Sequence, residues 1–234
     1  MQPIDRLIEA IEREARRAAF PIDAPVYERA GRDPQRPILC AGTLAAPLCV
    51  FARDLGKDEV AEGQPLIGAA GRLVRAGIVA AWTGAPPTKG DRTLEVALEH
   101  ALLTNTVPYK PPGNKAYAEA VKERFRPFLA ELLTALWRGD RVLSLGTEAF
   151  AWFARYAAPG AAEEFWRRED RYEADLPCVL VARHDGREVR KPITLGPLPH
   201  PSPLNQRWYK QFPDLLARRL EAIRPHAAPN IRAR

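Results

Sequence analysis

Apolar residues recur at helical spacing in several long segments of the chain. The first segment is residues 3–19. Its apolar positions are Ile4, Leu7, Ile8, Ile11 and Ala15, and charged residues lie between them. A spacing of three and four residues predicts an amphipathic helix. The same pattern predicts helices over residues 65–82, 116–138 and 204–223. In the segment 116–138, Pro127 is compatible with a helix only as a kink or a boundary.

Shorter apolar runs lie between these segments and predict strands. Residues 102–107 and 141–145 have the composition of strands, whereas residues 38–44 and 48–52 fit a buried strand or a helical segment equally well. Two further runs, 178–183 and 189–195, flank the sequence HDGRE, whose Asp-Gly pair is a hairpin signal. We therefore expect a β-hairpin near the carboxyl end of the chain.

The segments that connect these elements carry turn signals. Residues 21–37 contain four prolines and predict an extended surface connection. After the run 141–145, Gly146 predicts a turn and Thr147 the N-cap of a helix that reaches about Tyr156. We expect residues 226–234 to be a frayed tail.

Alternation of strands with long helices predicts an α/β fold. We expect a three-layer α/β/α sandwich around a central, mostly parallel sheet of about four strands. The sequence shows no internal repeat and no domain boundary, so we expect residues 1–234 to form one domain, with residues 1–37 as its N-terminal helix and connection.

The composition excludes several classes of protein. With 234 residues, of which 46% are apolar, the chain has enough apolar residues for a core, which excludes intrinsic disorder. No run approaches the roughly 18 apolar residues of a membrane span, and the charged N-terminus does not resemble a signal peptide. Cys40, Cys49 and Cys178 lack CxxC spacing, so we expect reduced thiols in a cytoplasmic protein and no metal site. The net charge of +6 favours a polyanionic partner.

Polar residues follow the predicted strands where ligands bind in α/β folds, beyond the carboxyl ends of the strands. They are the loop within residues 52–71, Asn105 in LLTNTVP and His200 in LGPLPHPSPLN. Each also fits a structural role, as a polar turn, a backbone hydrogen-bonder or an exposed histidine. Their order along the chain carries more information than any one of them.

In that order, these segments resemble motifs of the uracil-DNA glycosylase superfamily. ARDLG, DE, GQPLIG and AGRLV resemble the first loop of its iron–sulfur branch, and TNTVPYKPPGN resembles the strand that ends in asparagine and leads into PPGN. The helix and the strand of the family resemble the segment RPFLAELLTALWRGDRVLSLG. The histidine loop of another branch resembles HPSPLN. The resemblance implies hydrolysis of the N-glycosidic bond of uracil, or of another deaminated base, in DNA.

The chain departs from the family at five positions. Tyr109 and Phe125 stand where the iron–sulfur branch has cysteines, so we expect no cluster and no other cofactor. Gly56 replaces a tyrosine that excludes the methyl group of thymine, and Leu66 replaces a phenylalanine that stacks on the base. Arg53 replaces an acidic residue. These changes bear on which base is accepted more than on the reaction itself.

The resemblance assigns a role to each candidate catalytic residue. Asn105 would hydrogen-bond to uracil, and a neutral His200 would stabilise the departing anion. Asp54 would position water and stabilise the cationic sugar, although Asp58 and Glu59 are alternatives for this role. We expect Asn105 to bind the base together with Leu66, Gly56 and Arg53.

A second group of residues is expected to hold DNA. These residues are Lys110, Gly113, Asn114, Ser202, Leu204 and Arg207. Leu204 would enter the minor groove and fill the space left by the flipped nucleotide, while the others contact the backbone. We expect Arg72 and Arg75 on the solvent face of their helix.

The sequence leaves more than one function open. The first hypothesis is a monomeric, monofunctional uracil-DNA glycosylase of base-excision repair. The second is a protein that binds abasic or damaged DNA, or cross-links to it through His200, with little turnover. The third is a nucleotide-binding α/β protein, which is disfavoured because neither GxGxxG nor GxxxxGK[ST] occurs.

Overall fold

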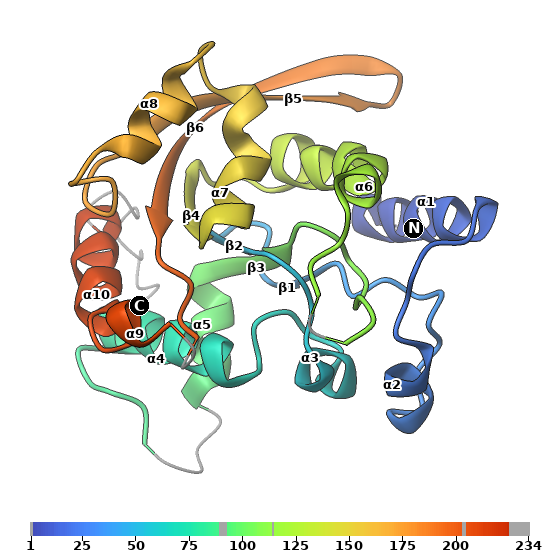
Figure 1. Cartoon of the computed structure of the whole chain (residues 1–234), viewed down its shortest axis with the longest axis horizontal. Helices are drawn as coiled ribbons and strands as arrows, with labels where there is room; N and C mark the ends of the chain where they lie inside the picture. The colour runs from blue at the N-terminus through green and yellow to red at the C-terminus, as the bar shows by residue number, and fades with distance from the viewer. Residues whose placement is uncertain (1, 89–92, 114, 203–204, 225–234) are drawn as a thin grey trace, which may run out of the picture.

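A six-stranded sheet forms the centre of the computed structural model, which describes residues 2–88, 93–113, 115–202 and 205–224. Its strands are β1 (Cys40–Gly42), β2 (Leu48–Ala52), β3 (Ala101–Asn105), β4 (Arg141–Leu145), β5 (Leu176–His184) and β6 (Arg187–Leu198). They lie in the order β1-β3-β2-β4-β6-β5 (Figure 1). The four inner strands are parallel, and β1 and β5 pair antiparallel at the two edges.

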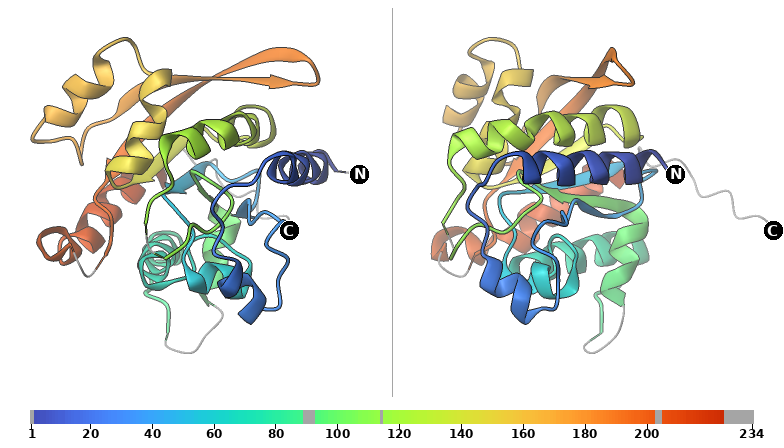
Figure 2. Two further views of the ribbon diagram at one scale, coloured as in Figure 1. Left: turned by 45° about the vertical axis from the view of Figure 1, so that its right-hand side comes forward. Right: turned by 90° about the vertical axis from the view of Figure 1, so that its right-hand side faces the viewer.

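Helices cover both faces of this sheet (Figure 2). One face is covered by α1 (Pro3–Arg17), α6 (Glu119–Glu131), the π-helix η1 (Leu132–Leu136) and α7 (Thr147–Phe153). The other face is covered by α4 (Ala69–Thr83), α5 (Thr93–His100) and α10 (Phe212–Ile223). The shorter helices are α2 (Ala24–Arg29), α3 (Lys57–Glu62), η2 (Ala154–Tyr156), α8 (Ala161–Arg167) and α9 (Gln206–Tyr209).

Strand β2 shows how the sequence builds the three layers. All five of its residues are buried, because a central parallel strand is covered on both sides. Cys49 and Phe51 join the core beneath α1 and α6, whereas Leu48 and Val50 join the core beneath α4 and α10. The period of two along a strand therefore divides one apolar run between two hydrophobic cores.

The expected α/β/α sandwich with a mostly parallel sheet is confirmed, but the expected count of about four strands is wrong. The four parallel strands gain two antiparallel edge strands, one of them from the predicted hairpin. The hairpin turn at Asp185 and Gly186 has φ values of 47° and 76°, the left-handed pair that an Asp-Gly turn favours. Among the described residues, no helix has the length and apolar character needed to span a membrane.

Three local predictions differ from the structure. Residues 21–37 contain the short helix α2, which tolerates Pro25 because a proline in the first turn loses no helical hydrogen bond. Pro127 lies inside α6, which continues to Glu131, so the boundary alternative is wrong and the kink stays a prediction. The N-cap of α7 is Gly146, with φ of 85°, and Thr147 is its first helical residue.

Other elements were not predicted or were merged. Helix α3 lies within residues 52–71, which the sequence suggested to be a loop, and α5 and α8 carry no strong pattern. The single helix expected over residues 204–223 is divided into α9 and α10 within the described part of that segment. The expected tail, residues 226–234, lies outside the described residues.

Candidate active site

The carboxyl ends of the parallel strands lie along one edge of the sheet and carry the candidate catalytic residues. Ala52, the last residue of β2, pairs with Asn105, the last residue of β3. Asp54 follows β2 by two residues, and His200 follows β6 by two residues. Parallel strands in register present these positions at the same edge, as in other α/β sheets that bind ligands there.

Thr106 links the residues that follow β2 to those that follow β3. The backbone carbonyl of Arg53 accepts hydrogen bonds from the backbone N–H of Thr106 at 3.0 Å and from its hydroxyl at 2.6 Å. The residues after β2 are thereby fixed against those after β3. Thr106 is wholly buried, and sequence reasoning did not single it out because its partner lies far away along the chain.

Asn105 presents a buried acceptor with no partner. The residue is only 2% exposed, and its Oδ1 accepts no hydrogen bond from any residue that the structure describes. A buried acceptor left unpaired costs about 1–3 kcal/mol. Such a group is expected where a ligand supplies the missing donor.

The carboxylate of Asp54 is also buried, and it too lacks a hydrogen-bond partner among the described residues. The side chain is 5% exposed, and within the described part of the chain neither carboxylate oxygen accepts a hydrogen bond. Nε of Arg53 lies 3.1 Å from Oδ2 as an ion-pair contact. Burial raises the pKa of Asp54 to about 6, and the charges of Arg53 and Lys122 oppose that rise. At neutral pH the carboxyl group is therefore mostly ionised.

His200 is held against the turn that follows β4. A Cβ atom on Gly146 would lie 3.0 Å from Cβ of His200, so this close approach and a φ of 85° both favour glycine there. The carbonyl of His200 accepts a hydrogen bond from the N–H of Ser202 at 2.9 Å. Burial and the charge of Arg53 lower the pKa of His200. The imidazole is therefore neutral at neutral pH and can donate one N–H.

The carboxylate of Glu59 stabilises the loop that carries Asp54. One carboxylate oxygen accepts from the N–H of Gly56 at 3.0 Å, and the other accepts from the N–H groups of Ile67 at 3.2 Å and Gly68 at 2.9 Å. Asp58 is exposed at the start of α3. Of the three acids suggested by the sequence, Asp54 alone combines a buried carboxylate with no hydrogen-bond donor among the described residues.

Gly56 leaves no room for a side chain at its position. A Cβ atom there would lie 2.5 Å from Oε2 of Glu59. A side chain at this position would therefore have to displace the Glu59 carboxylate.

Leu66 adopts a backbone conformation that is rare for leucine. Its φ is 55°, which costs roughly 1–3 kcal/mol and often marks a ligand clamp. Its carbonyl accepts a hydrogen bond of 2.8 Å from Nε of Arg75, and a Cβ atom on Gly71 would lie 2.0 Å from its carbonyl carbon. The expectation that Arg75 faces solvent is wrong, because the residue is fully buried and bonds to Leu66, Pro65 and Gln64.

Lys110 does not face solvent, which argues against the expected phosphate contact. It is 3% exposed, and its Nζ donates to Asp23 at 2.7 Å, to the Pro111 carbonyl at 2.9 Å and to the Gly113 carbonyl at 2.7 Å. A lysine ammonium has three donors, and all are used here. The N–H of Gly113, a second expected phosphate donor, points to Asp23 at 3.2 Å. This loop is tied to the N-terminal segment.

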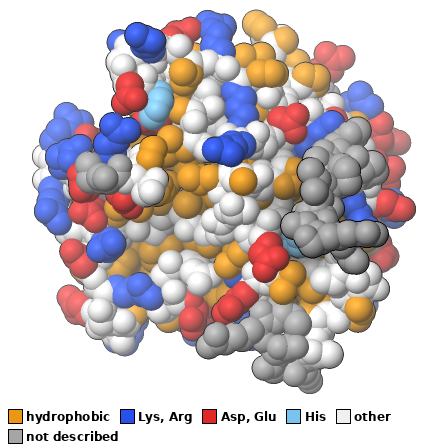
Figure 3. All heavy atoms as spheres, turned by 180° about the vertical axis from the view of Figure 1, so that it is seen from behind, with side chains coloured by type: hydrophobic (Ala, Val, Ile, Leu, Met, Phe, Trp, Pro, Cys, Tyr) orange, Lys and Arg blue, Asp and Glu red, His pale blue; other side chains and the backbone are white. Residues whose placement is uncertain are grey.

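The structure describes the other expected DNA contacts only in part. Ser202 is half-buried beside His200, with its backbone N–H bonded inward. Arg207 belongs to α9, but its side chain lies outside the description, as do Asn114 and Leu204 entirely. On the face shown in Figure 3, basic and acidic side chains are interspersed, and those that the structure describes form no continuous basic stripe there.

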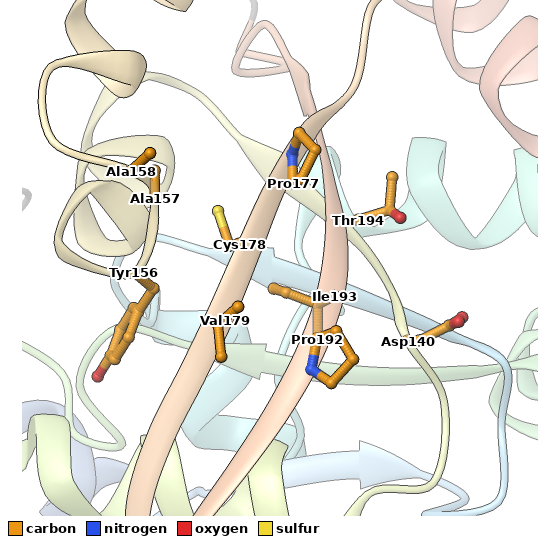
Figure 4. Close-up of a pocket in the computed structure, with 10 residues that line it drawn as sticks. All are labelled: Asp140, Tyr156, Ala157, Ala158, Pro177, Cys178, Val179, Pro192, Ile193 and Thr194. Atoms are coloured by element: carbon orange, nitrogen blue, oxygen red, sulfur yellow. The ribbon is translucent and has the colours of Figure 1, made fainter.

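A cavity of about 580 Å³ lies away from these residues, beside the edge strand β5 (Figure 4). Its wall includes Tyr156 of η2, Cys178 and Val179 of β5, and Pro192 and Ile193 of β6. None of the candidate catalytic residues lines it.

A comparison with models of known protein families identifies the family of this chain. The model of the uracil DNA glycosylase superfamily matches residues 41–224. The chain belongs to this superfamily. No curated protein matches the chain significantly. Membership supports a DNA glycosylase, a hydrolase that acts on DNA in base-excision repair.

The residues of this superfamily member do not suit an iron–sulfur cluster at the positions where one branch has cysteines. Tyr109 and Phe125 lie with their ring centroids 5.4 Å apart, and Phe20 from the end of the α1 segment lies 5.3 Å and 5.0 Å from them. The Tyr109 hydroxyl donates to the Gln35 carbonyl at 2.9 Å. Aromatic packing fills this part of the core, and burial raises the pKa of the Cys40 and Cys178 thiols to about 11.

Proposed function

We propose that the chain is a monofunctional uracil-DNA glycosylase that works as a monomer and needs no metal or organic cofactor. The observation that carries the proposal is the buried, unpaired Oδ1 of Asn105 at the strand edge that also bears Asp54 and His200. A flipped uracil would supply the donor that Oδ1 lacks.

Base recognition follows from the donor and acceptor pattern of the Asn105 amide. Its carbonyl accepts the N3–H of uracil, and its NH₂ group donates to O4. Cytosine presents an acceptor at N3 and a donor at N4, so both contacts become repulsive in the same rotamer. A site that requires specific hydrogen bonds rejects the wrong partner strongly, because buried polar groups are then left unpaired.

Hydrolysis places opposite charges on the two halves of the substrate. The C1′–N1 bond breaks, its electron pair moves onto the base, and the sugar gains oxocarbenium character. A neutral His200 donates a hydrogen bond to the developing O2 anion. The ionised Asp54 stabilises the sugar cation and orients a water whose oxygen bonds to C1′, while its carboxylate accepts the proton that the water loses.

Leu66 and Gly56 shape the space around the base. Leu66, fixed by Arg75 in its left-handed conformation, gives an apolar contact in place of an aromatic ring. We assign the DNA contacts to Ser202, Leu204, Arg207 and Asn114, and leave Lys110 and Gly113 in a structural role. The DNA that these residues bind is a duplex that contains uracil or another deaminated base.

The test is excision from a labelled duplex with one uracil, followed by alkaline cleavage at the abasic site and detection of free uracil. Parallel duplexes with thymine, cytosine, hypoxanthine or xanthine define the preferred base. Strand scission together with released uracil supports the proposal, and Asp58→Asn, a change at an exposed acid, should retain it. Tight or covalent retention of abasic DNA with no released base would instead favour the DNA-binding hypothesis.

A further inference from the structure

Arg53 contacts one titratable residue of the proposed reaction, Asp54, and its charge reaches the other, His200. Its Nε is buried 3.1 Å from Oδ2 of Asp54, and its positive charge also acts on His200. The side chain is 37% exposed, so part of it is in contact with solvent. Its backbone is held by Thr106, which fixes where the guanidinium begins.

The other charges around Asp54 are largely compensated by one another. From α6, Lys122 faces Asp54 but forms ion pairs with Glu148 of α7 and, at 3.4 Å, with Glu119. The backbone of Tyr117 also favours the ionised form of Asp54. Among the described residues, Arg53 forms no ion pair with any other carboxylate. It is therefore the cation whose charge is directed mainly at Asp54.

We propose that Arg53 is a positioning residue that keeps Asp54 ionised and His200 neutral, so that the site remains active in mildly acidic solution. The inference rests on the proposed function. A nearby cation favours the deprotonated form of a carboxylic acid and of an imidazole alike. The reaction needs the deprotonated form of both residues, so one guanidinium supports both requirements.

The sign of the pH effect follows directly. Both groups become active as pH rises through their pKa values, so both contribute to the acid limb of the rate profile. Removing Arg53 leaves the burial of Asp54 and His200 in place but removes the opposing charge at Asp54 and the charge that disfavours protonated His200. The acid limb therefore moves to higher pH. A cation at ion-pair distance typically changes such a pKa by roughly 1–3 units.

The experiment measures single-turnover excision of uracil from about pH 5 to about pH 9 at saturating enzyme. The enzymes are the wild type, Arg53→Gln, Arg53→Lys and a control, Lys57→Gln, which removes an exposed positive charge at the start of α3. For Arg53→Gln we expect the acid limb to move up by roughly one pH unit or more, so that the rate near the wild-type midpoint is about fivefold lower, or lower still, and the deficit shrinks as pH rises. Arg53→Lys should recover much of the shift, and Lys57→Gln should keep the wild-type midpoint.

A rate that falls by the same factor at every pH, with an unmoved acid limb, would overturn the inference and leave the proposed function intact. Titration of the His200 ring by NMR in the free proteins gives a second readout that needs no turnover. Arg53→Gln should raise the pKa of His200 relative to the wild type, and an unchanged or lower value would also overturn the inference. Absence of excision by the wild type at any pH would refute the proposed function instead.

Discussion

Replacement of Asn105 by leucine should separate function from stability. The two side chains have similar shapes, but leucine removes a buried acceptor that has no partner within the described structure. An unpaired buried polar group costs about 1–3 kcal/mol, so its removal should leave the free energy of unfolding unchanged or raise it by about 1 kcal/mol. For a chain of 234 residues, about 1 kcal/mol corresponds to an increase of about 2–4 °C in Tm.

The same substitution should strongly reduce excision of uracil. Loss of one preorganised contact to the reacting group typically removes about 2–4 kcal/mol of transition-state stabilisation, or a factor of about 30 to 1,000 in rate. Calorimetry and single-turnover excision on the same preparation measure both quantities. Asn105→Asp should also lose uracil excision and can admit cytosine, because the O–H of a protonated carboxyl group can donate a hydrogen bond to N3 of cytosine.

Thr104→Val on the same strand is the matched control. Thr104 is fully buried, and its hydroxyl donates to the Leu39 carbonyl at 2.7 Å, so valine removes a buried hydrogen bond. We expect a loss of about 1–3 kcal/mol in stability with nearly wild-type excision, the reverse of the Asn105 result. If Asn105→Leu destabilises the fold and excision stays within a few-fold of wild type, Asn105 is a structural residue and the assigned site is wrong.

Three further outcomes follow from the structure. Lys110→Met should lower stability by about 3 kcal/mol, because it leaves Asp23 without its buried partner, and should not weaken binding to non-specific duplex in a salt titration. Glu59→Gln should destabilise the protein by about 1–3 kcal/mol, because an amide has one acceptor oxygen for the three N–H groups that the carboxylate accepts, whereas Asp58→Asn should be neutral in both unfolding and excision assays. The purified enzyme should be colourless and keep its activity after chelation, since aromatic rings fill the positions of the cluster ligands; a visible absorption band lost together with activity would refute this.

The layers of the fold and the position of the candidate residues at the carboxyl ends of the strands were predictable from sequence, because they depend on local periodicity. An apolar run followed by Asp54, Asn105 or His200 places each residue at a strand end, and parallel pairing then aligns the ends. The number of strands was less accessible, because β1 and β5 join the sheet only as antiparallel edges. Edge pairing depends on which neighbour is available in space.

The roles of individual charged residues were the least predictable. Lys110 resembles an exposed phosphate ligand until Asp23, 87 residues away, is seen to bind it. Arg75 has the helical spacing of a surface residue but turns inward to bond the carbonyls of Pro65 and Leu66. Glu59 fits a catalytic acid by its position, yet its oxygens are used by backbone N–H groups. Long-range partners of this kind leave no periodic signal in the sequence.

The most direct test of the account is a comparison of turnover and binding in Asp54→Ala and His200→Ala. Uracil release is measured under single-turnover conditions, and the affinity for duplex that contains an abasic site is measured in the same buffer. Both residues act on the transition state, so each variant should lose most of its excision rate while binding abasic duplex nearly as the wild type does. Wild-type excision in both variants, or loss of binding in proportion to rate, would contradict the assignment of these residues to the chemical step.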